Sequence, residues 1–580
     1  MSSNPAASRT ASVAVALGLF TISAAILALE VLQTRILTYC LDPLLLYAAV
    51  PLALLGIGAS GTALSLWQGW RRARLGSLCA LCSVGFAISL VLAHMLFAYL
   101  SGDRWVSTES FAGDGVLTFG MNLPTIVMMG GLAVPYFFAG ATVTACLASS
   151  GEGVHGTYFV NLLGSALGCF VVFFAIEPLG APALLVMIAI LGVLAGSLFL
   201  LAGSGRLVRT LCIAGAAITM PAVAVSDRLF PFSPDPAGQL AYLIRLARKH
   251  PEYREQRVFE AWDPTGRIEF HRFAKLDAML PEPVPFLFYS QDGSAGSLLF
   301  GVGDDLSRAK GLFDRTLYGA GYHLRGTAQT RKVLIIGLGG GPDVMTALHF
   351  GAESIVGVEI NASTIRAVSG PLADFAGDPY GRAELTLAHM DGRTFVRSTD
   401  RKFDLIVMSG VDTKSILAAG SLAINENHLY TVEAFGEYLD HLEPGGHLAF
   451  LRFTSFDRLR LLSLGVSALR ARGVAHPERH FVVLKQAHLW TSVIIGRESI
   501  SADQVARIRA WTEDVPAPDT GIRLPVYDVL GLSLSAPPEL VYPGGKPEKE
   551  EDAATFLAAV IDGQEQDFID RHPLNLSPTT

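Results

Sequence analysis

One stretch of the chain, Lys332 to Glu359, limits the possible folds more than any other. It contains an apolar β-branched run, a glycine-rich turn, a helical stretch and a second apolar run that ends in an acid. This order predicts a strand, a tight turn, a helix and a second strand, which is the repeating unit of a doubly wound α/β domain. The turn contains four glycines, Gly337, Gly339, Gly340 and Gly341.

The same stretch predicts a ligand as well as a fold. Glycines let the backbone turn sharply and approach a ligand closely, and the following helix offers free N–H groups. Glu359, about 20 residues beyond the first glycine, is placed to accept hydrogen bonds from two ribose hydroxyls. The stretch therefore predicts a nucleoside-type cofactor site, with a ligand-free glycine turn as the alternative.

The composition divides the 580 residues into two parts. The chain is 51% hydrophobic and only 17% charged, and its first lysine is Lys249. Residues 1–226 are therefore expected to form a membrane block, and the rest a soluble part. A net charge of −8 argues against a general nucleic-acid-binding role. All six cysteines lie in the apolar part, where Cys79-x-x-Cys82 lacks a second ligand pair, so we expect buried thiols and no metal.

Six apolar runs are long enough to cross a bilayer, and a seventh, 210–226, is shorter and contains Pro221. The six runs are 12–34, 45–67, 77–100, 123–148, 157–176 and 180–202. Arginines cluster in two short loops, which predicts that these loops and the N-terminus face the cytoplasm at an inner membrane. If the seventh run spans, the soluble part is periplasmic. We favour the cytoplasmic side, with the seventh run interfacial or re-entrant.

Side chains inside the apolar runs have two interpretations. Glu30 and Arg35 are either functional intramembrane charges or interfacial residues. Asn161, Gly164 and Gly168 have the small and polar character of a close helix contact.

The remainder is expected to contain four segments. These are a linker at 227–256, a small β region at 257–305, a doubly wound domain at 306–540 and a tail at 541–580. In the linker, Gln239 to His250 forms a basic amphipathic helix that lies on the inner leaflet or packs on its own domain. The core strands are expected at Val333–Gly337, Ile355–Glu359, Leu385–His389, Phe403–Met408 and His447–Phe453, with an antiparallel edge at His480–Lys485 and Leu489–Ile495.

Polar residues follow four of these strands, at the edge where ligands bind in this fold class. Asp343 follows the glycines, Glu359 ends the second strand, and Asp391-Gly392 follows the third. Ser409 and Asp412 follow the fourth. For Asp391 the alternative is a helix cap, and for Asp412 a catalytic or substrate-binding role is favoured.

These residues resemble a known family. The Lys332–Glu359 run, Asp391-Gly392, the strand end FDLIVMSGVD and the following NENHLYTVEAF resemble the spermidine synthases, aminopropyltransferases related to class I methyltransferases. ALEVLQTRIL and YFVNLLGSALG resemble stretches of the membrane-bound bacterial members. In such members a comparable chain continues beyond NLSPTT, so this chain is expected to be a fragment or a short form.

The resemblance implies roles for individual residues. The four glycines would line decarboxylated S-adenosylmethionine or S-adenosylmethionine, Glu359 would hold its ribose, and Asp391-Gly392 would approach the adenine. An aspartate pair, D-x-x-D, would bind and deprotonate the amine. Here Ser409 stands at the first position of that pair and Asp412 at the second. Pro342 stands where the family has an acid, and Asp343 follows it.

Further contacts are expected from two other segments. Glu426 and Tyr430 are candidates for substrate contact, and Tyr289, Gln291 and Asp292 lie where the β region would meet the cofactor or amine. A structural role is the alternative for each. The expected protein is a membrane-anchored transferase acting on a polyamine or amphiphilic amine, with a homodimer as the candidate assembly. A methyltransferase and a non-catalytic sensor or transporter remain alternatives.

Overall fold

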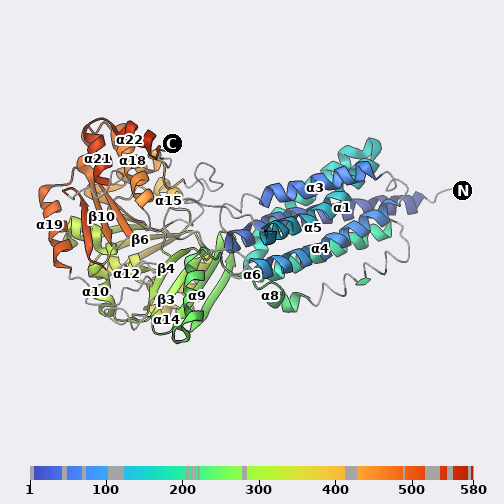
Figure 1. The fold of residues 1–580 in the computed structure, drawn as a ribbon, viewed down its shortest axis with the longest axis horizontal. Coiled ribbons are helices and arrows are strands. Elements are labelled where there is room, and N and C mark those ends of the chain that lie inside the picture. Colours follow the sequence, from blue (N-terminus) through green and yellow to red (C-terminus); the bar gives the residue numbers. More distant parts are fainter. Residues whose placement is uncertain are drawn as a thin grey trace. The chain divides into compact units, whose positions relative to one another are not determined.

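The structure is a computed structural model with two compact units. It describes residues 5–41, 49–67, 74–101, 123–202, 210, 213–214, 217, 222–276, 284–411, 428–452, 455–486, 490–515, 536–544, 553–572 and 576–578. The first unit comprises Met1–Ala241 with Ala261–Gly266, and the second comprises Tyr242–Glu260 with Arg267–Thr580. Helices make up most of the first unit, and two sheets with their helices make up the second (Figure 1).

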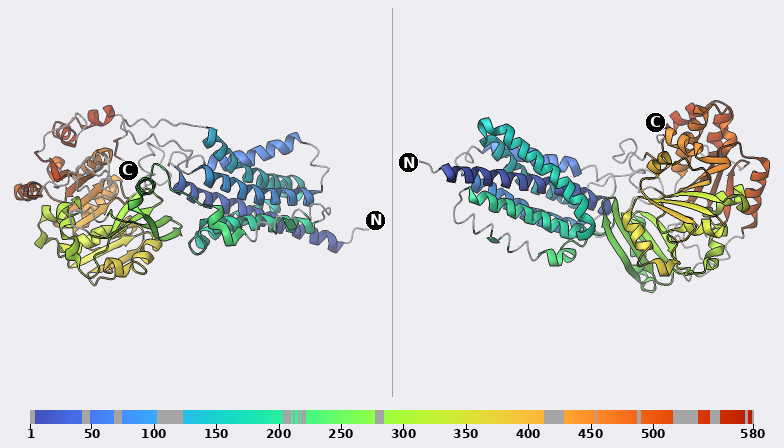
Figure 2. Two further views of the ribbon diagram at one scale, coloured as in Figure 1. Left: turned by 60° about the horizontal axis from the view of Figure 1, so that its bottom comes forward. Right: turned by 180° about the vertical axis from the view of Figure 1, so that it is seen from behind.

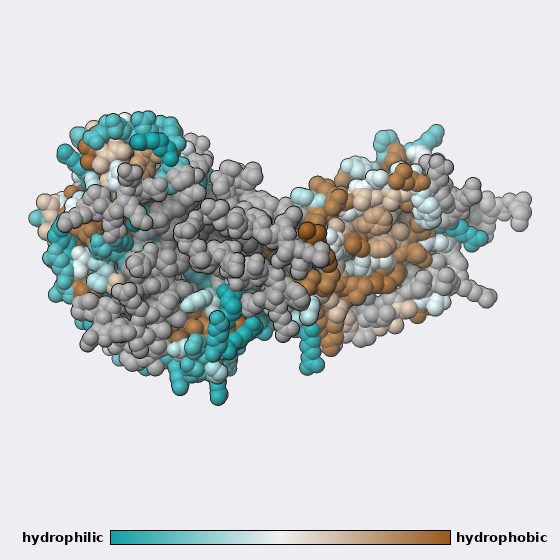
Figure 3. Space-filling model, in the orientation of Figure 1, coloured by the Kyte–Doolittle hydropathy of each residue, from teal (hydrophilic) through white to brown (hydrophobic). Residues whose placement is uncertain are grey.

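The first unit is a bundle of apolar helices. They are α1 (Pro5–Cys40), α3 (Ala49–Leu66), α4 (Leu75–Leu100), α5 (Leu123–Ser149), α6 (Val154–Leu201) and the short α8 (Ser226–Leu229). Four of them, α1, α4, α5 and α6, are long and apolar enough to cross a membrane, and α3 is shorter. Within the described residues, the expected six or seven crossings are therefore not confirmed. Apolar side chains also cover much of the outer surface of this unit that Figure 3 displays.

The long helix α6 is in fact two helices joined at Gly180. This glycine has φ 74° and ψ 159°, and Pro178 and Pro182 flank it. The first half runs along α1, since Gly164 lies against Phe20 and Gly168 against Ala24. In the second half Phe199 lies back against Gly18. The chain therefore reverses at Gly180, and the runs expected at 157–176 and 180–202 form an antiparallel pair.

Helices α1 and α6 touch backbone to backbone. A Cβ added to Gly164 would lie 2.3 Å from the Phe20 carbonyl oxygen, and one added to Gly168 would lie 2.2 Å from that of Ala24. Beside them the Ser23 hydroxyl donates to the Asn161 side-chain oxygen over 2.9 Å. Small residues at such a contact let two helices approach closely. The interpretation of these residues as packing residues is therefore confirmed.

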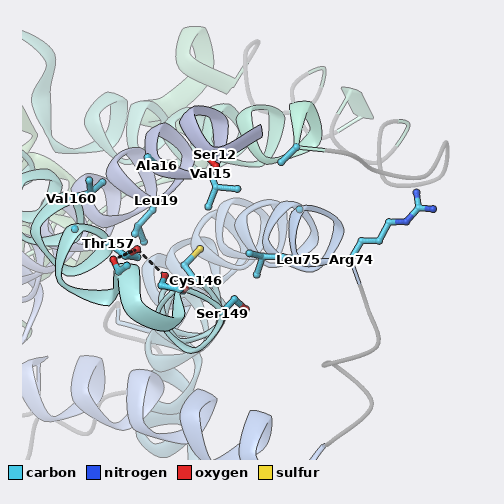
Figure 4. Close-up of a pocket in the computed structure, with 15 residues that line it drawn as sticks. Ser12, Val15, Ala16, Leu19, Arg74, Leu75, Cys146, Ser149, Thr157 and Val160 are labelled. Carbon is cyan, nitrogen blue, oxygen red and sulfur yellow. Dashed lines mark hydrogen bonds between the residues drawn. The ribbon is translucent and has the colours of Figure 1, made fainter. Parts of the chain in front are cut away.

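A cavity of about 970 Å³ lies between α1, α4, α5 and α6 (Figure 4). Its lining is small and hydroxyl-bearing, with Ser12, Ser149 and Thr157 among the wall residues. Arg74 is also part of the lining, but its guanidinium points away from the cavity in the close-up.

The second unit begins within α9 (Gln239–Lys249), at the position of the expected amphipathic helix. A four-stranded sheet follows, with its strands in chain order. The strands are β1 (Glu255–Asp263), β2 (Gly266–Phe273), β3 (Phe286–Gln291) and β4 (Ala295–Phe300). Strands β2, β3 and β4 pair antiparallel, and the β3–β4 hairpin turns at Asp292 and Gly293.

The larger sheet has eight strands in the order β12-β10-β11-β9-β8-β5-β6-β7 (Figures 1 and 2). Strands β9, β8, β5, β6 and β7 are parallel, and β11, β10 and β12 form an antiparallel edge. The strands are β5 (Lys332–Ile336), β6 (Ser354–Glu359), β7 (Leu385–His389), β8 (Phe403–Ser409), β9 (Leu442–Arg452), β10 (Phe481–Gln486), β11 (Trp490–Gly496) and β12 (Pro538–Tyr542). The expected doubly wound sheet and its antiparallel edge are confirmed, and β12 extends that edge.

Helices accompany these strands. They are α10 (Lys310–Arg315), α11 (Ala320–Arg325), α12 (Pro342–His349), α13 (Ala362–Val368), α14 (Ala373–Ala376), α15 (Gly392–Ser398), α17 (Val432–Asp440), α18 (Ser455–Ala471), α19 (Ala502–Asp514), α21 (Ala553–Ile561) and α22 (Glu565–Arg571). Strand β5 lies between β8 and β6, so the loop after β5 is flanked by the ends of both neighbours. This order decides which side chains meet at the site.

Candidate functional site

The loop after β5 has a backbone that only glycine adopts readily. Gly337, Gly339 and Gly341 have φ values of 80°, 52° and 88°. Gly340 is required for a different reason, because a Cβ there would lie 2.4 Å from the carbonyl oxygen of Leu298 in β4. The Tyr380 hydroxyl donates to the Gly339 carbonyl over 2.8 Å and holds the loop from the other side. The four-glycine pattern thus reflects both turning and close packing.

Glu359, at the end of β6, lies directly beside this loop. Its Oε2 accepts from the backbone N–H groups of Leu338 and Gly339 at 3.0 and 3.1 Å. Its Oε1 accepts from the backbone and the side chain of Asn361 at 2.8 and 3.2 Å. The side chain is 3% exposed, and burial raises its pKa although these hydrogen bonds oppose the shift. The acid is therefore held firmly at the predicted place.

The β3–β4 hairpin supplies a second wall. The Gln291 side-chain oxygen accepts from Asn361 at 3.1 Å, and the hydroxyls of Tyr289 and Thr364 lie 3.2 Å apart. Ser297 in β4 accepts from the Gly340 N–H at 3.4 Å. Gln291 is thus linked to Glu359 through Asn361, whereas Tyr289 contacts Thr364, and the contact of both residues with a cofactor or amine stays a prediction.

Asp292 has another surrounding. It is buried with φ 50°, and its carboxylate accepts from the backbone N–H of Arg267 at 2.8 Å. These contacts describe a residue that holds the hairpin turn against β2.

On the other flank of the loop, Asp343 and Ser409 form a pair. The Ser409 hydroxyl, at the end of β8, donates to Asp343 Oδ1 over 2.9 Å. Asp343 is in the first turn of α12 and is 4% exposed, whereas Ser409 is only partly buried. Burial raises the pKa of Asp343 to about 7, and the hydrogen bond from Ser409 opposes this shift only in part. Asp343, the acid that follows Pro342, therefore contacts Ser409, the serine at the first position of the D-x-x-D pattern.

Phenol groups surround this pair. Tyr318 and Tyr322 have raised pKa values, first because they are buried and second because Asp343 is near. The pKa of Tyr380 is raised by burial and then by Glu359, Tyr289 and Asp343. Within the described residues, neither Asp343 nor Glu359 forms an ion pair with a basic side chain.

Asp391 is placed as a helix cap. Its Oδ1 accepts a hydrogen bond from the Thr394 N–H at 2.8 Å, and Asp391 is thus the N-cap of α15. A helix cap was the alternative to adenine contact that the sequence left open. Gly392 is buried, and a Cβ there would lie 2.4 Å from the Ile336 side chain in β5. Gly392 therefore lets α15 approach β5 closely, next to the start of the glycine loop.

Among the remaining predicted residues, Tyr430 is the one that the structure describes. Tyr430 is 9% exposed in the core beside Phe450, with the Arg452 guanidinium 5.1 Å from its ring centre. Asp412 and Glu426 lie outside the described residues. Asn361, Thr364, Tyr380, Tyr318 and Tyr322 were not anticipated. Only Asn361 had a sequence signal, as a polar residue just after the acid at the end of β6.

Together these features define a class of protein. A parallel sheet, a glycine loop at its carboxyl edge and an acid at the end of the neighbouring strand form the arrangement of nucleoside-binding doubly wound domains. No group of three or more His, Cys, Asp or Glu side chains that would hold a metal ion occurs in the part of the chain that the structure describes.

Comparison with known proteins narrows this class. No family model matches the chain. Polyamine aminopropyltransferase 2 of Hyperthermus butylicus is 32% identical over 117 residues, which are 20% of this chain and 36% of that protein. The polyamine aminopropyltransferase of Pseudomonas syringae pv. tomato is 33% identical over 98 residues, 17% of this chain and 33% of that protein. The polyamine aminopropyltransferase of Serratia proteamaculans is 36% identical over 85 residues, which are 14% of this chain and 30% of that protein.

The chain thus spans about a third of the length of these curated relatives. Among solved structures, a spermidine synthase in complex with the transition state analogue AdoDATO has a TM-score of 0.31 and 16% identity, covering 48% of this chain and 88% of that one. The spermidine synthase from Thermotoga maritima gives the same values. The sequence matches confirm the resemblance to the spermidine synthases, and the relatives are transferases by name.

Proposed function

We propose that the chain is a membrane-anchored transferase that moves an aminopropyl group from an adenosyl sulfonium donor to an amine. One observation carries the proposal. Asp343 and Glu359, both buried, flank one glycine loop without a basic partner among the described residues. Buried carboxylates are costly unless a cation compensates them, and both a sulfonium donor and a protonated amine are cations.

The residue types around the glycine loop suit the binding of a nucleoside donor. When bound, the donor would supply a carbon made electrophilic by the neighbouring sulfonium. The positive-φ glycines would allow close approach of the backbone, and Glu359 would accept hydrogen bonds from ribose hydroxyls. Those hydroxyls would compete with the four donors that Glu359 now has. Gln291 and Asn361 would orient the acid, and Asp412 would contact the amine.

The test is a by-product assay. Purified full-length protein in detergent receives a polyamine mixture and either S-adenosylmethionine or its decarboxylated form, and mass spectrometry detects the nucleoside released. We expect methylthioadenosine from the decarboxylated donor. S-adenosylhomocysteine would instead establish methyl transfer. This second candidate is favoured because Pro342 stands where the spermidine synthase pattern has an acid, and the acid of this chain is the next residue, Asp343. Tight binding without either product would overturn catalysis and favour a sensor or transporter.

The helical unit is proposed to be the membrane anchor. The helices α1, α3, α4 and α5 and the two halves of α6 would give six crossings, because α6 reverses at Gly180. The arginine loops assign the N-terminus to the cytoplasm. Phe199, near the end of α6, lies beside Gly18 in the first half of α1, whereas the Asp235 N–H donates to the carbonyl of Tyr39 at the other end of α1. The chain therefore leaves the bundle at the end opposite to the N-terminus, which supports a periplasmic second unit over the cytoplasmic one expected from the sequence. Cysteines introduced at exposed positions of the second unit should then react with a membrane-impermeant thiol reagent in intact cells. Protection there would establish the cytoplasmic side.

A further inference from the structure

We propose that Ser409 and Asp343 together take the proton from the attacking amine, with Ser409 touching the amine and Asp343 receiving the proton behind it. This inference rests on the proposed function and deepens it. Its basis is a hydrogen bond between two side chains that lie at the same edge of the sheet. Asp343 is in α12, which follows β5, and Ser409 ends the neighbouring strand β8.

The geometry assigns different tasks to the two residues. Ser409 is partly exposed at the carboxyl edge, while Asp343 is buried, and 2.9 Å separate Ser409 Oγ from Asp343 Oδ1. Ser409 is the only hydrogen-bond partner of the Asp343 side chain within the described residues. A serine hydroxyl alone is a poor base, but one that donates to a carboxylate can pass its proton on. Asp343 is therefore a positioning and proton-receiving residue, and Ser409 the contact residue.

The proton balance closes with these two groups. The amine nitrogen bonds to the carbon beside sulfur, the carbon–sulfur bond breaks, and its electron pair stays on sulfur as a neutral thioether. The excess proton on nitrogen passes to Ser409 Oγ as the serine proton passes to Asp343 Oδ1. Asp343 then becomes a neutral acid, the form that a buried site favours.

Electrostatics couple this step to the charge of the donor. Burial raises the pKa of Asp343 to about 7, close to the working range of a general base. The groups that face it are the hydroxyl of Ser409 on β8 and the phenols of Tyr318, Tyr322 and Tyr380, all neutral at pH 7. A bound cation therefore favours ionised Asp343 before transfer, and loss of the cationic charge favours its protonation afterwards.

The first experiment measures protons and needs no turnover. Titration calorimetry with S-adenosylmethionine at pH 7, in two buffers of different ionisation enthalpy, gives the protons released on binding. The wild-type protein should release about half a proton more than Asp343→Asn, because a group with a pKa near 7 is half protonated at that pH. Equal proton release with equal affinity would overturn the role of Asp343.

The second experiment moves the carboxylate. Asp343→Asn should lower kcat by about 10²- to 10⁴-fold, a much larger factor than its effect on donor affinity, as for loss of a general base. Adding Ser409→Asp to this variant supplies an acid at the partly exposed position. The kcat of the double variant should be at least tenfold higher than that of Asp343→Asn alone. An unchanged kcat in Asp343→Asn, or no recovery in the double variant while it still binds donor, would contradict the proposal.

The chain contains a matched control. Asp305 and Ser307 form the same kind of aspartate–serine pair, because the Ser307 hydroxyl donates to the Asp305 carboxylate over 2.6 Å. This pair is exposed, however, and the hydrogen bonds from Ser307 lower the pKa of Asp305. Asp305→Asn should change neither proton release nor kcat. If the wild-type protein releases no nucleoside from either donor, the proposed function fails, and the calorimetric comparison still judges Asp343 separately.

Discussion

Glu359 and Asp343 are two buried carboxylates on opposite flanks of one loop, and their surroundings differ sharply. Glu359 accepts four hydrogen bonds, three of them from backbone N–H groups, so both its oxygens are fixed. Among the described residues, Asp343 accepts one hydrogen bond, from a hydroxyl that can itself donate or accept a proton. Burial raises the pKa of both acids, but the opposing contributions are far more numerous at Glu359.

The difference teaches how one fold separates two tasks of an acid. A carboxylate held by backbone donors has a fixed direction, which suits recognition of a ligand. A carboxylate held by a single hydroxyl has a proton affinity that responds to nearby charge, which suits proton transfer. The following predictions test this separation.

The largest effect is expected for Glu359→Ala. The change leaves the N–H groups of Leu338, Gly339 and Asn361 without their acceptor, and three such losses destabilise the second unit by about 3–6 kcal/mol. Donor affinity should fall at least 100-fold, as measured by calorimetry. The exposed Glu353, changed to Ala, is the control and should have little effect on either quantity. Unchanged affinity in Glu359→Ala would refute the assignment of the ribose.

For Asp343 the comparison predicts a distinct pH dependence of stability. Folded Asp343 keeps its proton up to about pH 7, whereas an unfolded aspartate loses it near its ordinary pKa of 3.8. The folded state therefore binds more protons in this window, and its stability falls as the pH rises from 4 to 7. The loss relative to Asp343→Asn reaches up to about 4 kcal/mol.

Unfolding midpoints of both proteins in detergent between pH 4 and 8 measure this difference. Parallel curves for the two proteins would mean that Asp343 is ionised throughout.

Gly340→Ala perturbs the loop without touching either acid. The new Cβ would lie 2.4 Å from the Leu298 carbonyl oxygen, and such overpacking costs about 1–3 kcal/mol. Donor affinity should fall with stability, because the loop must move away from β4. Gly339→Ala has its nearest side-chain contact at 3.3 Å and should cost less, although φ is 52° there. A larger loss for Gly339→Ala would show that backbone strain outweighs packing.

The smallest effect is expected at the third acid, Asp391. If it only caps α15, Asp391→Ala lowers stability by about 1 kcal/mol and Asp391→Asn, an equally good cap, leaves it unchanged. Donor affinity should be the same in both variants. A tenfold loss of affinity in Asp391→Asn would instead support contact with the adenine.

The sequence allowed much of this arrangement to be predicted, where local pattern and topology agree. The apolar runs identified the strands, the glycines identified the loop, and strand order brought Glu359 beside it. The pairing of Asp343 with Ser409 was not predictable, because the pattern gives strand ends but not which side chains touch there. The residues are 66 positions apart and meet only because β5 and β8 are neighbours.

Other residues resisted prediction for physical reasons. Tyr430 is amphipathic and fits a crevice or a core equally well, and packing against Phe450 and Arg452 decides its place. Tyr322 and Tyr380 belong to segments without a recognisable pattern, so their approach to the two acids depends on tertiary structure alone. The break at Gly180 was visible only as a gap between two apolar runs, and its reversal of direction required the contacts with α1.

The contact between α1 and α6 also sets an order of events during synthesis. Ser23 and Asn161 are 138 residues apart, so the glycine face that receives α1 does not exist when α1 leaves the ribosome. At about 5–20 residues per second, the delay is on the order of 10 s. Throughout that interval α1 lacks the helix with which it makes its closest contact. Formation of this contact is therefore timed by translation of the Gly164–Gly168 segment rather than by the first helix.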